Sequence, residues 1–396
     1  MNIIRKIRNC VGQFSIKYMV LFLLITGVTI TSFSYKKGKN ETKISEPETV
    51  LRLSPSENNP RNSEGDFISL KDGRVLFVYS HFYGDSDCDD APAFLAGRYS
   101  NDGGRTWSKE DEIIVPNEGE MNVMSVSLLR LQNGDIALFY GLKNSLKNSI
   151  PQMRISKDEA KSWSDPVPVI TDKKGYFVLN NDRVIQLEDG RLLLAVALHT
   201  TPGGEWKWGG DLYCYYSDDN GTTWTSGGKV PDTTDVGTQE PGLIELKDGR
   251  IMMYARATGG FQQLAYSSDR GETWSHIEPS NIPSPVSPAT IEKIPGTGDW
   301  LLVWNNNDGS NPEIKDKRTP LTAAISKDEG KTWKFIKNIH DDPDGWYCYI
   351  AVHFVNGENI LLSYCAGNRP QGTDLAITEI TLLDKSWLYN KIDAKR

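Results

Sequence analysis

Six short segments carry most of the side chains in this sequence that could do chemistry together. Each is polar and leads into an apolar run: Glu64–Asp66, Asn122–Ser125, Asn181–Arg183, Gln239–Glu240, Ser287–Pro288 and Tyr347. They supply carboxylates, a guanidinium, amides, hydroxyls and a phenol. Gathered in one place, such groups form a site for a polar ligand. Because they are far apart along the chain, the fold must bring them together.

Tight hairpins follow these segments at a regular interval. Short motifs such as "LKDGR", "LQNGD" and "LEDGR" stand between apolar runs, and their glycines are Gly73, Gly134, Gly190, Gly249, Gly298 and Gly357. Asp-Gly or Asn-Gly between alternating apolar residues is the strongest short signal for a β-hairpin. The sequence therefore predicts six hairpins in six similar units.

A second repeat runs in phase with the hairpins. Its pattern is Ser-x-Asp-x-Gly-x-Thr-Trp, in five copies that begin at Ser100, Ser156, Ser217, Ser267 and Ser326. The second copy departs from it with Ala160 and Ser162. Ser and Asp side chains bond nearby backbone N–H groups, and Gly accepts a positive φ, so each copy predicts a closed turn. The tryptophan then covers the turn and buries a large apolar area.

Together the repeats predict an all-β fold, a six-bladed β-propeller over residues 47–396. Four-stranded units of this kind bury their faces by stacking around an axis. We expect Thr49–Ser54 to pair with strands near Thr373–Leu383 and close the ring. The first strand of each blade lines the axis, which places the six polar segments at one mouth.

Several segments resemble the sialidase (neuraminidase) superfamily, and the likeness covers roughly residues 47–383. Gln239–Trp274, "QEPGLIELKDGRIMMYARATGGFQQLAYSSDRGETW", resembles the fourth-blade segment, which implies roles for Glu240 and Arg256. Lys317–Trp333 resembles the segment that carries another substrate-binding arginine, here Arg318. "GWYCYIAV" resembles the strand with the nucleophilic tyrosine, which maps to Tyr347.

The resemblance implies a specific chemistry. Two guanidiniums, of Arg256 and Arg318, would hold a substrate carboxylate. A neutral tyrosine, Tyr347, would avoid the repulsion that a carboxylate nucleophile meets beside that group. Glu240 would be its base. The acid that protonates the leaving group is expected in the loop "YGDSDCDDAP", as Asp90 or Asp89.

Two positions depart from the superfamily pattern. The arginine that usually opens the first blade is replaced by Glu64, and the glutamate that usually supports this arginine is replaced by Cys365. Arg61 is a candidate substitute, although a strand shift of three residues reverses its facing. Further candidates for binding sugar hydroxyls are Glu64, Asp66, Asn181 and Arg183.

These residues favour a sialidase-like exo-glycoside hydrolase that releases a terminal acidic sugar with retention. One alternative is a carbohydrate-binding propeller without catalysis. Another is a hydrolase or lyase that acts on uronic-acid polysaccharide. In each case the partner is a glycan.

Other classes of partner are disfavoured by composition. The formal net charge is −8, and no basic run lies in the region after the leader, which argues against nucleic acid. No metal-ligand spacing or dinucleotide loop is present, so no cofactor is expected. Cys348 and Cys365 are symmetric about Asn356-Gly357, and either a cross-strand disulfide or two buried thiols fits.

The N-terminus predicts export. Basic residues precede the apolar stretch Met19–Ile30, and small residues follow at Ser32 and Ser34. This is the pattern of a signal peptide over residues 1–34, with an uncleaved membrane anchor as the alternative. Residues 35–46 are polar and read as a flexible lead-in. A secreted, periplasmic or cell-surface location follows.

Overall fold

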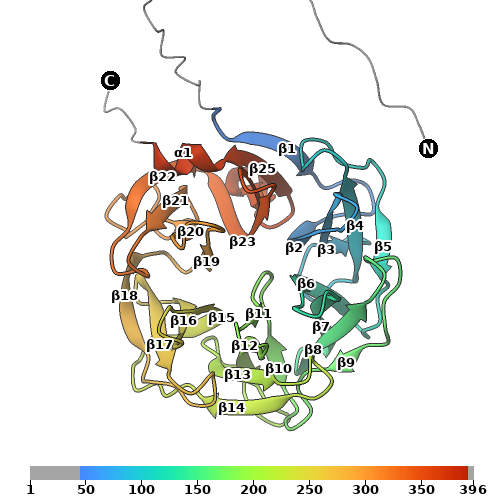
Figure 1. Ribbon diagram of the computed structural model, residues 1–396, viewed down its shortest axis with the longest axis vertical. Coiled ribbons are helices and arrows are strands. Elements are labelled where there is room, and N and C mark those ends of the chain that lie inside the picture. The colour runs from blue at the N-terminus through green and yellow to red at the C-terminus, as the bar shows by residue number, and fades with distance from the viewer. Residues whose placement is uncertain (1–44, 391–396) are drawn as a thin grey trace, which may run out of the picture. The chain divides into compact units, whose positions relative to one another are not determined.

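Short antiparallel strands provide nearly all the regular structure of the protein. The computed structural model describes residues 45–390, so the predicted signal peptide or anchor, residues 1–34, lies outside the described residues. The strands stand in a ring of small sheets around a central axis (Figure 1). The fold is the predicted six-bladed β-propeller. No helix between residues 45 and 390 is long and apolar enough to span a bilayer.

Each blade runs from an inner strand at the axis to an outer strand at the rim. Blade 1 consists of β2 (Asn62–Ser69), β3 (Val75–Phe82), β4 (Ala93–Ser100) and β5 (Glu112–Val115). Blade 2 consists of β6 (Asn122–Arg130), β7 (Ile136–Ser145), β8 (Asn148–Ser156) and β9 (Val167–Pro168). Blade 3 consists of β10 (Tyr176–Val178), β11 (Ile185–Gln186), β12 (Leu192–Thr200), β13 (Asp211–Ser217) and β14 (Thr225–Lys229). Blade 3 departs from the regular pattern, because its inner strand is split into β10 and β11, with Asn181 and Arg183 between them.

Blades 4 to 6 are regular. Blade 4 consists of β15 (Thr238–Glu245), β16 (Ile251–Ala257), β17 (Phe261–Ser267) and β18 (Glu278–Pro283). Blade 5 consists of β19 (Thr290–Lys293), β20 (Trp300–Asn305), β21 (Leu321–Ser326) and β22 (Lys334–His340). Blade 6 consists of β23 (Gly345–Val355), β24 (Asn359–Asn368), the 3₁₀ turn η1 (Arg369–Gln371), β25 (Thr378–Asp384) and β1 (Glu48–Leu53), and α1 (Lys385–Tyr389) follows β25. β1 pairs antiparallel with β25, which confirms the predicted closure of the ring by both ends of the chain.

The hydrophobic core is divided among the six interfaces between neighbouring blades. Phe67 and Phe77 of blade 1, for example, pack with Leu361 and Ile380 of blade 6. Each of the five turn tryptophans enters the cluster between its own blade and the preceding one: Trp107, Trp163, Trp224, Trp274 and Trp333. The tryptophan turns therefore hold the blades together.

The interface between blades 5 and 6 has no turn of this kind, and α1 takes its place. Trp387 and Leu388 of α1 are buried there with residues of β21 and β24. The Trp387 indole N–H also donates to Glu46 Oε2 at 3.0 Å. The sequence repeat did not predict this substitute, because Trp387 lies outside the repeated pattern.

We expect Trp387→Ala to lower the free energy of unfolding by about 3–5 kcal/mol, the usual cost of removing a buried tryptophan. Chemical denaturation followed by circular dichroism measures this change. Trp206→Ala is the matched control, because Trp206 is 53% exposed. Equal stability of the two variants would contradict the role given to α1.

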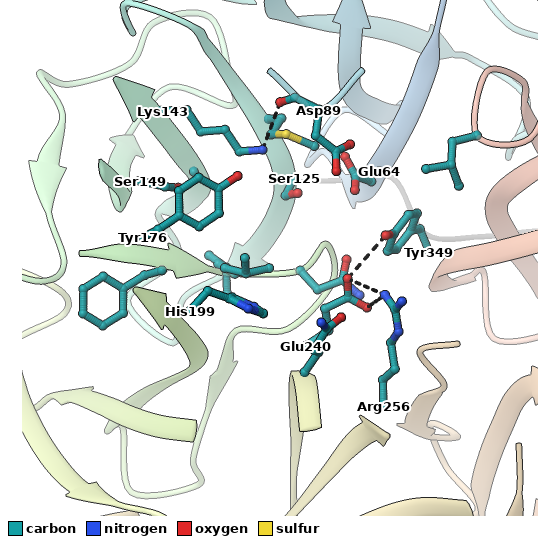
Figure 2. A pocket seen from close by; sticks show the side chains of 18 of the residues that line it. Glu64, Asp89, Ser125, Lys143, Ser149, Tyr176, His199, Glu240, Arg256 and Tyr349 are labelled. Carbon is teal, nitrogen blue, oxygen red and sulfur yellow. Dashed lines mark hydrogen bonds and ion pairs between the residues drawn. The ribbon is translucent and has the colours of Figure 1, made fainter. Parts of the chain in front are cut away.

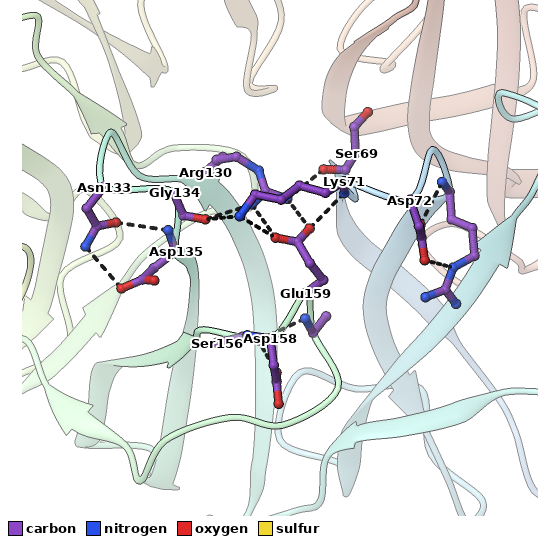
Figure 3. Close-up of polar contacts among 12 residues, drawn as sticks. Ser69, Lys71, Asp72, Arg130, Asn133, Gly134, Asp135, Ser156, Asp158 and Glu159 are labelled. Carbon is purple, nitrogen blue, oxygen red and sulfur yellow. Dashed lines mark hydrogen bonds and ion pairs between the residues drawn. The ribbon is translucent and has the colours of Figure 1, made fainter.

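Charged residues of the tryptophan turns add a second link between blades (Figure 3). Glu159, in the turn of blade 2, accepts hydrogen bonds from the Lys71 backbone N–H of blade 1 at 2.8 Å and from Arg130 Nη2 at 2.7 Å. Glu329 of blade 5 likewise accepts from the backbone N–H of Lys247 in blade 4, at 2.6 Å. This end of the ring is therefore occupied by structural contacts.

Candidate active site

Four inner strands carry a β-bulge at the opposite end of the ring from the hairpins. The pairing register shifts within β2, β6, β15 and β23. Each shift contains a non-glycine residue with positive φ: Glu64 (55°), Ser125 (62°), Glu240 (49°) and Tyr349 (57°). Such residues cost about 1–3 kcal/mol each and cluster where function requires them. A bulge redirects a side chain, and here all four line one cavity.

This cavity, called the axial cavity below, has a volume of about 350 Å³. Its wall combines residues of all six blades, among them Arg318. Figure 2 labels others: Glu64, Asp89, Ser125, Lys143, Tyr176, His199, Glu240, Arg256 and Tyr349. The volume and the concentration of charged groups suit a ligand of the size of one sugar.

Glu240 connects an arginine and a tyrosine within the axial cavity. Its two carboxylate oxygens accept hydrogen bonds from Arg256 Nη1, each at 2.9 Å. The Tyr349 hydroxyl donates to Glu240 Oε1 at 3.3 Å. Burial, together with the negative charge of Glu240, raises the pKa of Tyr349 well above its usual value. Tyr349 is therefore a neutral phenol beside a carboxylate that can take its proton.

The structure does not place Tyr347, the predicted nucleophile, in the axial cavity. Its ring stacks on His340 with centroids 5.1 Å apart and packs in the core between blades 5 and 6. Burial raises the pKa of Tyr347 to about 12. The register shift between Cys348 and Ala351 explains the error, because the bulge turns Tyr349 toward the axis. The assignment therefore moves by two residues, to Tyr349.

The spacing to the hairpin glycines is constant for three of the bulge residues, but it does not show which tyrosine faces the axis. Glu64, Ser125 and Glu240 precede the glycines of their hairpins, Gly73, Gly134 and Gly249, by nine residues each. Tyr349 precedes Gly357 by eight residues, whereas Tyr347 precedes it by ten. Counting nine residues back from Gly357 gives Cys348, midway between the two tyrosines, so this spacing does not distinguish them.

Arg318 approaches the axial cavity from the loop before β21. The side chain is 7% exposed, and its Nε and Nη1 atoms have no hydrogen-bond partner among residues 45–390. Its guanidinium carbon lies 5.2 Å from the ring centre of Trp346 and 5.6 Å from that of Tyr349. A buried guanidinium with unused donors is suited to an anionic group of a ligand.

Arg61 is buried behind the axial cavity and does not line it. Its Nη1 donates to Asp89 Oδ1 at 2.6 Å, and its Nη2 lies 3.6 Å from Glu64 Oε2. The structure thus does not support direct substrate binding by Arg61. Both carboxylates reach the cavity, and Arg61 stands between them.

Four other predicted residues also lie away from the cavity wall. Asp90 is exposed on the loop, and Asp66 accepts hydrogen bonds from the backbone N–H groups of Phe67 and Leu128 at 2.6 and 2.7 Å. Asn181 donates to the carbonyl groups of Gly65 and Tyr349, and Arg183 to that of Ala289. Asp66, Asn181 and Arg183 link blades near the axis, and none of the three lines the axial cavity.

A model of the BNR repeat-like domain matches residues 95–366. The chain belongs to this family, within the sialidase superfamily. It is 24% identical over 331 residues to a sialidase of Bacteroides fragilis, and 25% identical over 311 residues to a sialidase of Micromonospora viridifaciens. These matches cover 75% and 69% of this chain, and 58% and 44% of those relatives. The chain therefore spans less than two thirds of their length.

Solved structures of the superfamily share the fold. The intramolecular trans-sialidase of Ruminococcus gnavus superposes with a TM-score of 0.68 at 15% identity, covering 86% of this chain and 98% of that one. This degree of likeness supports the propeller, whereas the roles of individual residues depend on the geometry above.

One wall of the cavity in this BNR repeat-like protein was not predicted. Trp206 and Trp208, 53% and 46% exposed, lie on the loop between β12 and β13. Trp206 stacks on His199 with centroids 4.9 Å apart, and its edge meets Tyr176 at 5.0 Å. Two tryptophans in the otherwise polar run "TPGGEWKWGG" were the available signal.

Cys348 and Cys365 face each other across β23 and β24 as buried free thiols. Burial raises the pKa of Cys348, but the neighbouring Cys365 and Arg318 outweigh it and bring the value to about 7. Cys365, which stands where the superfamily resemblance implies a supporting glutamate, differs from Cys348, because burial raises the pKa of its thiol well above the usual value. No group of three potential metal ligands occurs among residues 45–390.

Proposed function

We propose that this protein is an exported exo-glycoside hydrolase of the sialidase type, which releases a terminal acidic sugar with retention through a covalent bond to Tyr349. The observation that carries the proposal is the hydrogen bond of 3.3 Å from the Tyr349 hydroxyl to Glu240 Oε1, inside a cavity of the size of one sugar. Relatives named sialidases support it. Export is inferred from the basic and apolar leader of the sequence.

The first step uses Glu240 as a base. Glu240 takes the phenolic proton while the Tyr349 oxygen forms a bond to the anomeric carbon. Arg256 holds both carboxylate oxygens of Glu240, so it orients the base. An uncharged phenol approaches an anomeric centre that bears a carboxylate without the repulsion that an aspartate or glutamate would meet.

Arg318 would hold the carboxylate of the sugar through its unused donors. Hydrogen bonds to charged groups contribute about 1.5–3 kcal/mol, so we expect Arg318→Met to lower kcat/KM for an acidic glycoside about 10- to 150-fold. Steady-state kinetics measures the loss. Arg250→Met is the control, because Arg250 does not line the axial cavity. Equal kinetics of the two variants would remove Arg318 from substrate binding.

The direct test is turnover of a panel of aryl sialosides and aryl uronides by the purified chain. NMR of the first product gives the anomeric configuration, and we expect it to match that of the substrate. An ultraviolet-absorbing unsaturated sugar would indicate elimination, and thus a lyase. Binding on a glycan array without any product would favour the alternative function, a carbohydrate-binding propeller without catalysis. The reason to consider this alternative is that Glu64 replaces the first-blade arginine.

A further inference from the structure

Three carboxylates among the described residues line the axial cavity: Glu64, Asp89 and Glu240. Their partners differ. Glu240 is held by Arg256 and Tyr349, as described above. Asp89 is held by Arg61 at 2.6 Å, and its side chain is 64% exposed. Glu64 is 6% exposed, and its cationic neighbour, 3.6 Å away, is the same Arg61.

The surroundings therefore shift the pKa values of Glu64 and Asp89 in opposite directions. Burial raises the pKa of Glu64 to about 7, against the attraction of Arg61. For Asp89, partial desolvation by the surrounding cavity wall also raises the pKa, but Arg61 and Lys143 outweigh it, and the pKa lies below its usual value. Six charged or titratable groups face Glu64: Arg61 from the segment before β2, Asp89 from the loop after β3, Lys143 of β7, Glu240 of β15, Tyr349 of β23 and Cys365 of β24.

Glu64 and Glu240 reach the cavity from blades 1 and 4, which are three blades apart in a ring of six. Figure 2 shows both side chains pointing into the cavity, with Tyr349 near them. Two carboxyl groups with different partners can take different roles in one reaction, since a general acid must hold a proton where a base must not.

We propose that Glu64 is the general acid that protonates the leaving-group oxygen, and that Asp89 is a positioning residue that keeps Arg61 in place. This inference rests on the proposed function. It differs from the sequence-based expectation, which gave the acid role to Asp89 or Asp90. It also gives a function to the first-blade position, where the resemblance implies an arginine.

The two half-reactions balance in protons. In the first, the bond between the anomeric carbon and the leaving oxygen breaks, its electron pair stays on oxygen, and that oxygen takes the proton of Glu64. The phenolic proton of Tyr349 passes to Glu240. In the second, Glu64 takes a proton from water, whose oxygen bonds to the anomeric carbon. The bond to the Tyr349 oxygen breaks, and Glu240 returns the proton to it.

The test compares Glu64→Gln with Asp89→Asn on two glycosides of sialic acid, the 4-nitrophenyl and the methyl glycoside. A 4-nitrophenolate leaves without help, whereas methoxide needs the proton. We expect Glu64→Gln to lower kcat for the methyl glycoside about 10²- to 10⁴-fold, and to affect the nitrophenyl glycoside much less. Asp89→Asn should lower both rates by a similar factor.

The pH profile gives a second readout. A general acid works in its protonated form, so kcat/KM of the wild type should fall as the pH rises through about 7. This limb should disappear in Glu64→Gln. Thermal unfolding shows that each variant is folded, and Glu64→Asp, which keeps a carboxyl group, should restore part of the methyl-glycoside activity.

Equal losses on both glycosides in Glu64→Gln, or a selective loss in Asp89→Asn, would overturn the assignment of Glu64. If Tyr349 is still labelled by a fluorinated sialosyl fluoride in that case, the proposed function stands while Glu64 fails. No turnover of either glycoside by the wild type, and no label, would overturn both proposals.

Discussion

Tyr349→Phe should lower the turnover of an activated aryl glycoside by about 10³-fold or more, because the phenolic oxygen is the proposed nucleophile. The substitution removes one oxygen atom from a buried ring. It breaks the hydrogen bond to Glu240 Oε1 and leaves the packing of the ring unchanged. Substrate binding should change little, so the loss is expected in kcat.

Tyr347→Phe is the matched control two residues away on the same strand. Tyr347 packs against His340 in the core between blades 5 and 6 and does not line the axial cavity. The activity of the Tyr347→Phe variant should therefore stay close to that of the wild type. The opposite result, a large loss in Tyr347→Phe with an active Tyr349→Phe, would contradict the geometry on which the site is built.

Glu240→Gln should cost about 10²–10⁴ in kcat, the usual contribution of a positioned general base. Burial raises the pKa of Tyr349 well above its usual value, so the phenol does not ionise on its own near neutral pH. The amide of Gln cannot take its proton. The amide also replaces the charged partner of Arg256 with a neutral one, which loosens that side chain.

The control for this variant is Glu245→Gln, at the far end of the same strand, β15. Glu245 accepts a hydrogen bond from the backbone N–H of Glu188 and does not line the cavity. Rates measured with the same aryl glycoside should be close to those of the wild type. A Glu240→Gln variant that matched this control would show that Tyr349 is activated by another group.

The fold could be predicted from short-range patterns because the propeller is built from local units. The hairpins around Gly73, Gly134, Gly190 and Gly249 and the tryptophan turns each specify one step of the chain. The pairing of β1 with β25 followed from the need to close the ring. Trp387 could not be predicted in this way, because it fills the interface between blades 5 and 6 but lies outside the repeated sequence pattern.

The candidate site was predictable where the sequence has an ordinary strand pattern around it. Glu240, Arg256 and Arg318 lie at the axial cavity, as the resemblance implied. Tyr347 was misplaced because an alternating pattern does not reveal a bulge, and a bulge shifts which residue faces the axis. Trp206 and Trp208 were missed because their loop carries no repeat that would place it.

The acid assignment shows a further limit of sequence. Asp89 and Asp90 were chosen as members of an acidic loop, but the charge state of a carboxyl group depends on its burial and its neighbours. Arg61, three residues from Glu64, contacts Asp89 instead of the cavity. The charges of Arg61 and Lys143 keep the pKa of Asp89 below its usual value, whereas burial raises that of Glu64, and the sequence alone shows neither effect.

The most direct measurement of the central claim is covalent trapping of the enzyme with a fluorinated sialosyl fluoride, followed by digestion and mass spectrometry. The account predicts one sugar per chain, attached to the Tyr349 oxygen, and no adduct in Tyr349→Phe. A sugar attached to Tyr347 or to a carboxylate of the cavity, or full turnover without any adduct, would contradict it.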